Sequence, residues 1–202
     1  MYFRRLLLGT AALLASTAGW AGENPLYEAT PAWVQTADIA AAAAKAKGPF
    51  VLFDRQERIE GDRVVAYIDT AIRLDSPQAL TRFGTLSAAW LPDKGDLTIH
   101  RAELIRAGTT IDLLKSGSKF TVLRREQQLE QRQLNGMLTA TMTVAGAQVG
   151  DIVRLGFTIS QADPALAGNV QRVETLPAQP FDVGLSRLTI SWPTGRNLRM
   201  AG

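Results

Sequence analysis

The chain has no cysteine, and its 202 residues include a single histidine, His100. Without a thiol there is no cysteine nucleophile, no disulfide and no cysteine-bound zinc. A single histidine also excludes a site that depends on a pair of histidine ligands. These absences are typical of a packed module rather than an enzyme, so we predict that the chain is not an enzyme. We predict no catalytic residues, no cofactor-binding residues and no metal ligands.

Long apolar runs are also missing, apart from one short run near the N-terminus. Residues 6–15 are apolar and follow Arg4 and Arg5, and small residues surround Ala21. The run is about half of the ~20 residues that a membrane-spanning helix needs. This order of basic, apolar and small residues is typical of a secretory signal. We predict a signal peptide over residues 1–21 and a periplasmic or secreted location in the bacterial cell envelope, with a retained N-terminal anchor as the alternative.

The chain also has no large excess of positive or negative charge. The net charge is +3, and removal of Arg4 and Arg5 with the signal leaves about +1. A nearly balanced chain lacks the basic footprint of a nucleic-acid-binding protein. We expect no nucleic-acid partner and no membrane span after signal removal.

Residues 22–48 form a lead-in segment of different composition. Pro25 and Pro31 interrupt regular structure. The alanine-rich residues 37–47 predict a short helix, with Asp38 as its N-terminal cap. Trp33 stands out in this stretch, and we expect it to dock the lead-in on the following domain.

The clearest strand signal is the alternation of residues 63–74. One face carries the apolar side chains at even positions, and the other face carries most of the polar ones. This period of two predicts a half-buried strand, paired as a hairpin with residues 50–59 through Glu60-Gly61-Asp62. The register places Ile68 in the core and Asp69 on the opposite face, where Asp69→Ala should cost little stability.

Further strand signals follow at short intervals, with turn residues between them. They cover residues 86–91, 97–106, 111–114, 120–123, 137–144, 152–160 and 188–192. Residues 77–84 interrupt the strands and suit one helical turn. Many short strands with little helical pattern predict an all-β fold, an antiparallel β-sandwich or barrel. We favour the antiparallel β-sandwich, preceded by the signal peptide and the helical lead-in.

Three motifs resemble catalytic or metal sites, and each has a structural interpretation that we prefer. The S-x-x-K match from Ser116 to Lys119 lies between two short strands, where a tight turn is expected. Asp93 and Asp96 flank Gly95 but lack the further carboxylates of a calcium loop, so a solvated turn is expected. His100 shares a strand face with Thr98 and Ala102 on period two and has no carboxylate beside it, which favours a structural histidine.

Two other features suggest binding, and again a structural interpretation comes first. Arg124-Arg125-Glu126 suits an anion or a partner, but exposed ion pairs at a strand end explain it equally simply. The scattered aromatic residues suit a core better than a sugar-stacking platform. These aromatic residues are Trp33, Phe83, Trp90, Phe120, Phe157 and Trp192.

Three stretches of sequence are similar to one known family. Residues 97–108, residues 120–127 and residues 149–153 resemble the DUF3857 domain, found at the N-terminus of bacterial exported transglutaminase-like proteins. Asp62-Arg63-Val64, Ser76-Pro77-Gln78 and Ser191-Trp192-Pro193 fit the same pattern. The resemblance implies a DUF3857-like β-sandwich domain over residues 49–202. It also implies that a catalytic Cys, His and Asp belong to a later papain-like core, so none of these roles passes to this chain.

The resemblance suggests a function that the residues alone do not give. It implies a non-catalytic accessory or interaction domain of a transglutaminase-like protein, whose partner is a downstream core in cis or in trans. The alternative is a stand-alone envelope module that binds polysaccharide or peptide. The sequence pattern at residues 198–202 predicts a chain that continues, although a truncated relative is also consistent with it.

Overall fold

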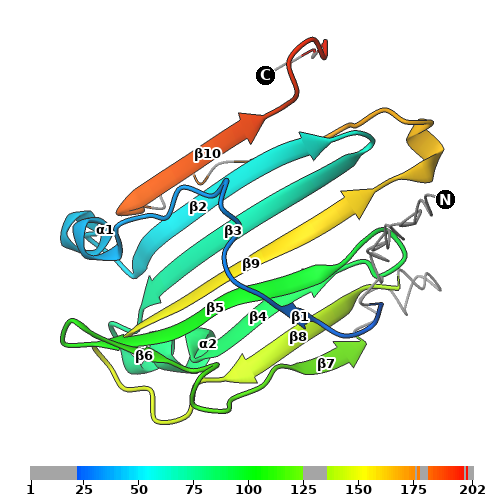
Figure 1. The fold of residues 1–202 in the computed structure, drawn as a ribbon. Coiled ribbons are helices and arrows are strands. Elements are labelled where there is room, and N and C mark those ends of the chain that lie inside the picture. Colours follow the sequence, from blue (N-terminus) through cyan, green and yellow to red (C-terminus); the bar gives the residue numbers. More distant parts are fainter. Residues whose placement is uncertain (1–21, 125–135, 176, 178–181, 198, 200–202) are drawn as a thin grey trace, which may run out of the picture.

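The computed structural model describes residues 22–124, 136–175, 177, 182–197 and 199. The predicted signal peptide at residues 1–21 lies outside the described residues. The described chain forms two packed β-sheets with two short helices (Figure 1). The predicted all-β sandwich is therefore confirmed.

Sheet A, the larger layer, has seven strands in the order β1-β5-β9-β3-β2-β10, with β6 paired to β5. Its strands are β1 Leu26–Tyr27, β2 Phe50–Glu60, β3 Arg63–Arg73, β5 Leu97–Arg106, β6 Thr109–Asp112, β9 Ile152–Ala162 and β10 Leu185–Ser191. Sheet B has three strands in the order β4-β8-β7. They are β4 Thr85–Trp90, β8 Leu138–Thr143 and β7 Thr121–Arg124.

Most strand pairs are antiparallel, but two are parallel. β1 pairs with β5 and β10 pairs with β2 in parallel orientation. Both parallel pairs lie at the two ends of the sheet A order, and each joins segments that are far apart in the chain. The β2–β3 hairpin forms as predicted, because Gly61 has a φ of +62° and Glu60 pairs with Arg63 across the turn.

The main core lies between the two sheets. The even-numbered residues of β3 face sheet B, as the alternation predicted, and Trp90 and Leu138 of sheet B face them from the other layer. Trp90 is 2% exposed and is among the largest side chains of this core. Phe120 and Phe157 are also buried there, so the core interpretation holds for these three aromatic residues.

The lead-in crosses the outer face of sheet A, the face turned away from sheet B. It runs from β1 across the sheet to helix α1, Ile39–Lys45, beside β2 (Figure 1). We call residues 28–38 the strap. Asp38 caps α1 by accepting a hydrogen bond from the Ala41 amide at 3.0 Å, as predicted. A second, smaller cluster of buried apolar residues, including Val51 and Ala71, lies between α1 and the sheet.

The strap changes the environment of the outer face, and here the prediction for Asp69 is wrong. Asp69 is 0% exposed and binds Arg154 through both carboxylate oxygens, at 3.0 and 2.7 Å. The period of two correctly assigned Asp69 to the face opposite the main core. That face is also buried, because the strap covers it.

A β-bulge in β5 corrects a second prediction. Ile99 pairs with Phe157 and Arg101 pairs with Gly156, so His100 is an extra residue in its strand. The bulge shifts the alternation by one, and the side chain of Ala102 is fully buried in the main core instead of sharing a face with His100. His100 and Arg101 both contact groups of the outer face.

Several element boundaries differ from the sequence predictions by a few residues. Helix α2, Pro77–Phe83, is capped by Ser76 and is longer than the single turn expected. β10 begins at Leu185, three residues before the predicted start, and β6 ends at Asp112 instead of residue 114. Within the described residues, no helix is both long enough and apolar enough to cross a membrane.

Candidate binding surfaces

A row of buried charges crosses the outer face of sheet A beneath the strap. Asp54 on β2 lies directly opposite Asp69 on β3, so two carboxylates share one cross-strand position. Each is matched by an arginine from its other neighbouring strand. Arg187 of β10 binds Asp54 at 2.7 and 2.6 Å, and Arg154 of β9 binds Asp69. The two arginines offset the repulsion that opposed carboxylates would otherwise cause.

The Asp69 half of this row contains further buried partners. The Tyr67 hydroxyl donates to Asp69 at 3.1 Å, and Arg101 lies 3.7 Å from the same carboxylate. Burial, followed by the charge of Asp69, raises the pKa of Tyr67 far above its usual range. Although burial alone would lower the pKa of Arg154, hydrogen bonds and charge from Asp69 raise it. Arg154 therefore stays protonated inside the protein.

The same face holds the strap through backbone hydrogen bonds. The Gln56 side chain donates to the Gln35 carbonyl at 2.8 Å and accepts from the Gln35 amide at 2.9 Å. Arg187 also donates to the Gln35 carbonyl, and Arg154 donates to the Ala37 carbonyl at 3.4 Å. A strap without regular structure needs such partners for its buried peptide groups. The charged row therefore fixes the strap and has the character of a structural network.

His100 contacts the same face of the sheet and the start of the strap. Its Nδ1 lies 3.1 Å from the Glu28 carbonyl oxygen, and its Nε2 lies 2.6 Å from the Thr158 hydroxyl. Burial lowers the pKa of His100 below its usual value. The bulge in β5 aims the ring at the start of the strap, so the structural interpretation of this histidine is supported by its contacts.

We expect this histidine to make the stability depend on pH. The unfolded chain binds a proton at His100 near pH 6.5, while the folded chain binds it only at lower pH. Stability should therefore fall as the pH drops from about 6.5 toward the lowered pKa. Urea melts of the wild type and His100→Gln from pH 7.5 to 5 would measure it. The difference in the free energy of unfolding between the wild type and His100→Gln should shrink as the pH falls. A difference that does not depend on pH would contradict this role of His100.

A groove beside the end of β10 is the surface feature that best suits a partner. It has a volume of about 610 Å³ and lies between the strap, the end of β2 and the residues after β10. Trp33 and Trp192 line it together with Pro193, and Trp192 is 43% exposed. Arg58 and Glu60, which pair at 3.0 Å, add a polar rim. The expected docking role of Trp33 thus has a geometric basis, but Trp192 is not a core residue.

β10 itself is the last strand of sheet A on this side. It pairs with β2 along one edge, and sheet A ends there within the described residues. Of its seven residues only Arg187 is charged, and this side chain is held by Asp54. An edge strand with so few protecting charges is able to pair with another chain.

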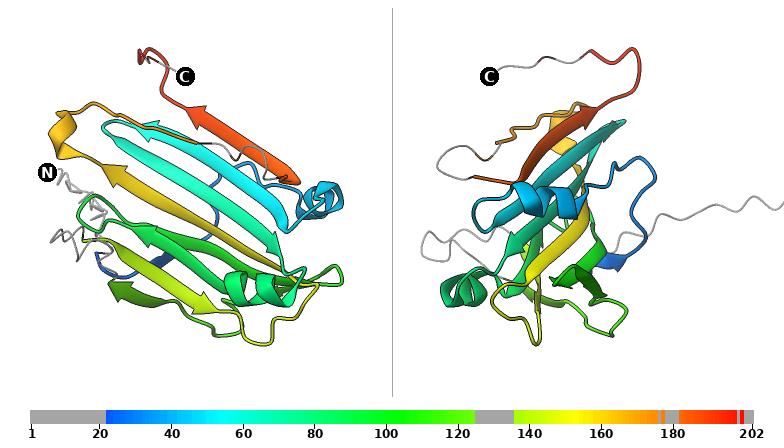
Figure 2. Two further views of the ribbon diagram at one scale, coloured as in Figure 1. Left: turned by 180° about the vertical axis from the view of Figure 1, so that it is seen from behind. Right: turned by 90° about the vertical axis from the view of Figure 1, so that its left-hand side faces the viewer.

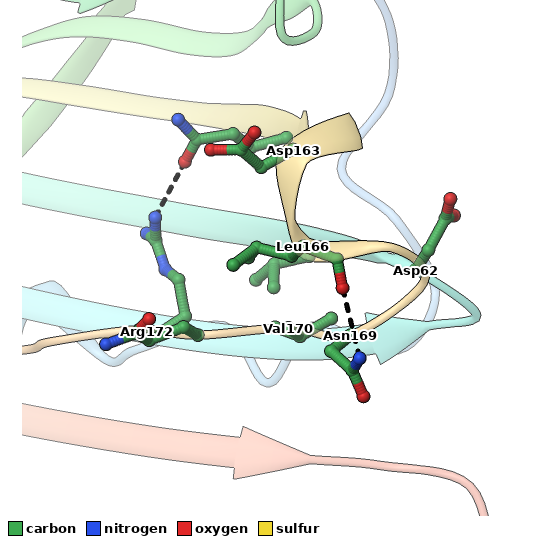
Figure 3. Close-up of a pocket in the computed structure, with 9 residues that line it drawn as sticks. Asp62, Asp163, Leu166, Asn169, Val170 and Arg172 are labelled. Carbon is green, nitrogen blue, oxygen red and sulfur yellow. Dashed lines mark hydrogen bonds between the residues drawn. The ribbon is translucent and has the colours of Figure 1, made fainter.

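A second, smaller pocket lies where β3 begins and β9 ends (Figure 3). It has a volume of about 120 Å³ and is lined by Asp62, Asp163, Asn169 and Arg172, among others. Arg172 donates to Gln161 at 2.7 Å, and Asn169 donates to the Leu166 carbonyl at 3.0 Å. The polar groups of this pocket bond to the protein itself, so we assign it a structural role.

Arg172 belongs to a compact group of four charges on the inner side of β2. Arg55 contacts Glu57 at 2.9 Å and Glu174 at 2.6 Å. Arg172 contacts the same two carboxylates at 3.1 Å each. Burial, and then the charge of Glu57, raises the pKa of Glu174. The group fixes residues 172–174 onto the sheet.

The remaining sequence candidates take structural positions. The Ser116 hydroxyl donates to the Leu113 carbonyl at 2.7 Å, which is the turn that was expected in place of an S-x-x-K site. Lys94, between Asp93 and Asp96, pairs with Asp163 at 2.7 Å. Within the part of the chain that the structure describes, no cluster of three His, Asp or Glu side chains suits a metal ion.

The other charged and aromatic candidates divide between surface and core. Arg124 pairs with Glu23 at 2.5 Å on the surface, while residues 125 and 126 lie outside the described residues. Phe83 is partly buried and packs edge-on against Phe50 with ring centres 6.0 Å apart. Sequence reasoning missed that Trp33 and Trp192 line one groove, because these residues lie far apart in the chain.

The comparison with protein families bears directly on this architecture. A profile described as "Domain of Unknown Function with solved-structure structure (DUF3857)" matches residues 61–202. The chain belongs to the DUF3857 family. The match includes β3 to β10 and therefore Trp192, whereas Trp33 and the strap precede it.

Two further comparisons place the DUF3857 chain among other proteins. No curated protein matches it. A solved structure named "putative protease", from Parabacteroides distasonis, has a TM-score of 0.49 and 16% sequence identity to it. That similarity covers 59% of the DUF3857 chain and 24% of the other chain.

Proposed function

We propose that this DUF3857 chain is an exported, non-catalytic interaction domain that acts beside a papain-like transglutaminase core, in cis or in trans. The observation that carries the proposal is the open edge of β10 next to the Trp33–Trp192 groove. The strand edge offers main-chain hydrogen bonds, and the two indole rings offer apolar contact area beside it. Large aromatic side chains of this kind are common anchors in protein interfaces.

The contacts of His100 and Ser116 support the non-catalytic part of the proposal. His100 bonds to the Glu28 carbonyl and to Thr158, and Ser116 bonds within its own turn. Neither residue is arranged as a nucleophile and base pair, which would need a hydrogen bond between the two. Export rests on the signal pattern of residues 1–21, and N-terminal sequencing of envelope protein would test cleavage near Ala21.

We predict that Trp192→Ala weakens docking without unfolding the chain. A transglutaminase-like core, fused after Gly202 or added separately, should shift the tryptophan fluorescence to shorter wavelength and raise the melting temperature, because bound partners stabilise the folded state. Trp192→Ala should reduce that binding about tenfold or more, as for an interface anchor. Trp33 and Trp90 remain as reporters in the mature variant.

The matched control is Phe83→Ala, because Phe83 packs on Phe50 at the start of β2, whereas Trp192 lies beside Glu60 at the end of β2. It should leave docking unchanged.

The purified chain should also show no amidase, protease or transglutaminase turnover. Turnover that disappears in folded His100→Ala or Ser118→Ala would overturn the proposal.

A second candidate is an envelope module that binds polysaccharide. It is favoured by the same two indole rings, because they line one open groove with a polar rim. Titration with a cell-wall oligosaccharide, followed by tryptophan fluorescence, separates the two candidates. Saturable quenching that is lost in both Trp33→Ala and Trp192→Ala would favour this second function.

A further inference from the structure

Among the described residues, sheet B is narrower than sheet A, and part of the inner face of sheet A has no facing strand. Sheet B has three strands and ends at β4, whereas sheet A has seven. Seen from behind, β9 and β3 lie between β4 and the orange segment that runs along β2 (Figure 2, left). Sheet B therefore does not extend over the whole inner face of β3.

The inner face of β3 is lined by cavities along its whole length. Cavities of about 180, 410 and 170 Å³ lie along it. Their floor includes every inward-facing residue from one end of β3 to the other. These residues are Val64, Ala66, Ile68, Thr70 and Ile72. Val64 and Ala66 are buried beside Arg55 and Arg172, whereas Ile68 and Ile72 are only partly buried and pack against the main core.

β4 forms one wall of this groove at the two smaller cavities, whereas Thr175, Pro177 and Val183 line the cavity of about 410 Å³. Thr85, Leu86 and Ser87 line one cavity, and Ala89 and Trp90 line another. β4 pairs with β8 on one side, and within the described residues sheet B has no strand on its other side. The groove thus combines an open strand edge with an apolar floor, which is the combination that a further β-strand would fill.

The charges that border the groove indicate the chemistry of its occupant. The charged side chains that line the three cavities are Arg55, Arg82 and Arg172. Arg82 lies over the Phe83 ring at 5.1 Å, and no salt bridge of Arg82 occurs among the described residues. Arg55 and Arg172 are already paired with Glu57 and Glu174. The unmatched positive charge is therefore at the α2 end of the groove.

We propose that this groove binds an extended peptide segment of another protein, which adds to sheet B as a strand next to β4. The segment has apolar side chains at alternate positions, facing β3, and an acidic residue at its end near Arg82. The six residues of β4 span about 20 Å, which fits a peptide of about six to eight residues. This site is separate from the β10 edge and does not depend on the function proposed for that edge.

The probe is a capped peptide of seven residues with valine at positions two, four and six, threonine between the valines and aspartate at both ends. We expect hydrogen exchange of the β4 amides to slow on binding, because each becomes part of a new ladder. β10 amides should not change. A peptide of the same composition with its three valines adjacent, and one with lysine ends, should bind about tenfold more weakly or worse.

Two variants test the apolar residues of β3 in the groove and the positive charge at its α2 end. Ile72→Ala removes an apolar contact and should weaken binding about tenfold. Its control is Val65→Ala on the outer face of the same strand, which should bind normally. Arg82→Glu, at an exposed position, should weaken binding at least fivefold at low salt and less at high salt.

Amide hydrogen exchange of the wild-type protein decides whether the peptide binds at β4. This test does not depend on whether a variant folds. Absence of β4 protection at about 1 mM peptide would overturn the proposal. Equal protection by the peptide with adjacent valines would overturn it as well. Protection of β4 that grows with protein concentration in the absence of peptide would replace it with self-association. Loss of docking at β10 with intact peptide binding would contradict only the proposed function.

Discussion

Asp69→Ala is expected to destabilise the protein by about 3–5 kcal/mol. The substitution removes both hydrogen bonds to the Arg154 guanidinium, whose side chain is 5% exposed, and so leaves a buried cation without its main partner. It also removes the acceptor for the Tyr67 hydroxyl. Urea unfolding at pH 7 measures the loss directly.

The matched control is Glu60→Ala, because Glu60 forms an ion pair with Arg58 in which both side chains are about half exposed. Its loss should be less than about 1 kcal/mol. The double variant Asp69→Leu with Arg154→Met should recover most of the stability, since no unpaired charge remains inside. Equal losses for Asp69→Ala and Glu60→Ala would mean that the strap does not cover this face in solution.

Trp90→Ala is expected to cost about 3–5 kcal/mol as well, for a different reason. Trp90 is 2% exposed in the main core between the two sheets, so its removal leaves a cavity that backbone on both sides keeps open. The same substitution at Trp192, which is 43% exposed, should cost less than about 1 kcal/mol. Thermal melts of the two variants compare one chemical change in two environments, and a similar loss for both would contradict the packing described.

The part of the fold that follows local sequence pattern could be predicted. The alternation of residues 63–74 correctly placed Ile68 on the core face, and the Gly61 turn correctly joined β2 to β3. The Asp38 cap was also correct, because capping depends on residues within one turn. Each of these features is decided by neighbours in the chain.

Features that depend on distant segments could not be predicted. Nothing near Asp69 indicates that residues 35–37 cover it, because the strap is held by side chains of β2, β9 and β10. The parallel partner of β10 lies more than a hundred residues earlier, at β2. The His100 bulge has no glycine or proline to mark it, and it reversed the expected face of Ala102.

The candidate surfaces were beyond local prediction for the same reason. Trp33 and Trp192 come together only because the strap crosses sheet A toward the strand that ends before Trp192. The groove along β3 exists because sheet B has fewer strands than sheet A, and a strand count in each layer is not readable from alternation. The sequence predicted a module without catalytic residues, and the surfaces proposed here for a partner became visible only in the structure.

We propose that the β10 edge and the Trp33–Trp192 groove dock a transglutaminase-like core. Hydrogen exchange of the wild-type chain, with and without that core, tests it most directly. We expect slower hydrogen exchange at the amides of residues 185–192 and around Trp33, and loss of this effect in Trp192→Ala. Unchanged exchange at β10 in a complex that demonstrably forms would contradict the claim, because the partner would then bind elsewhere.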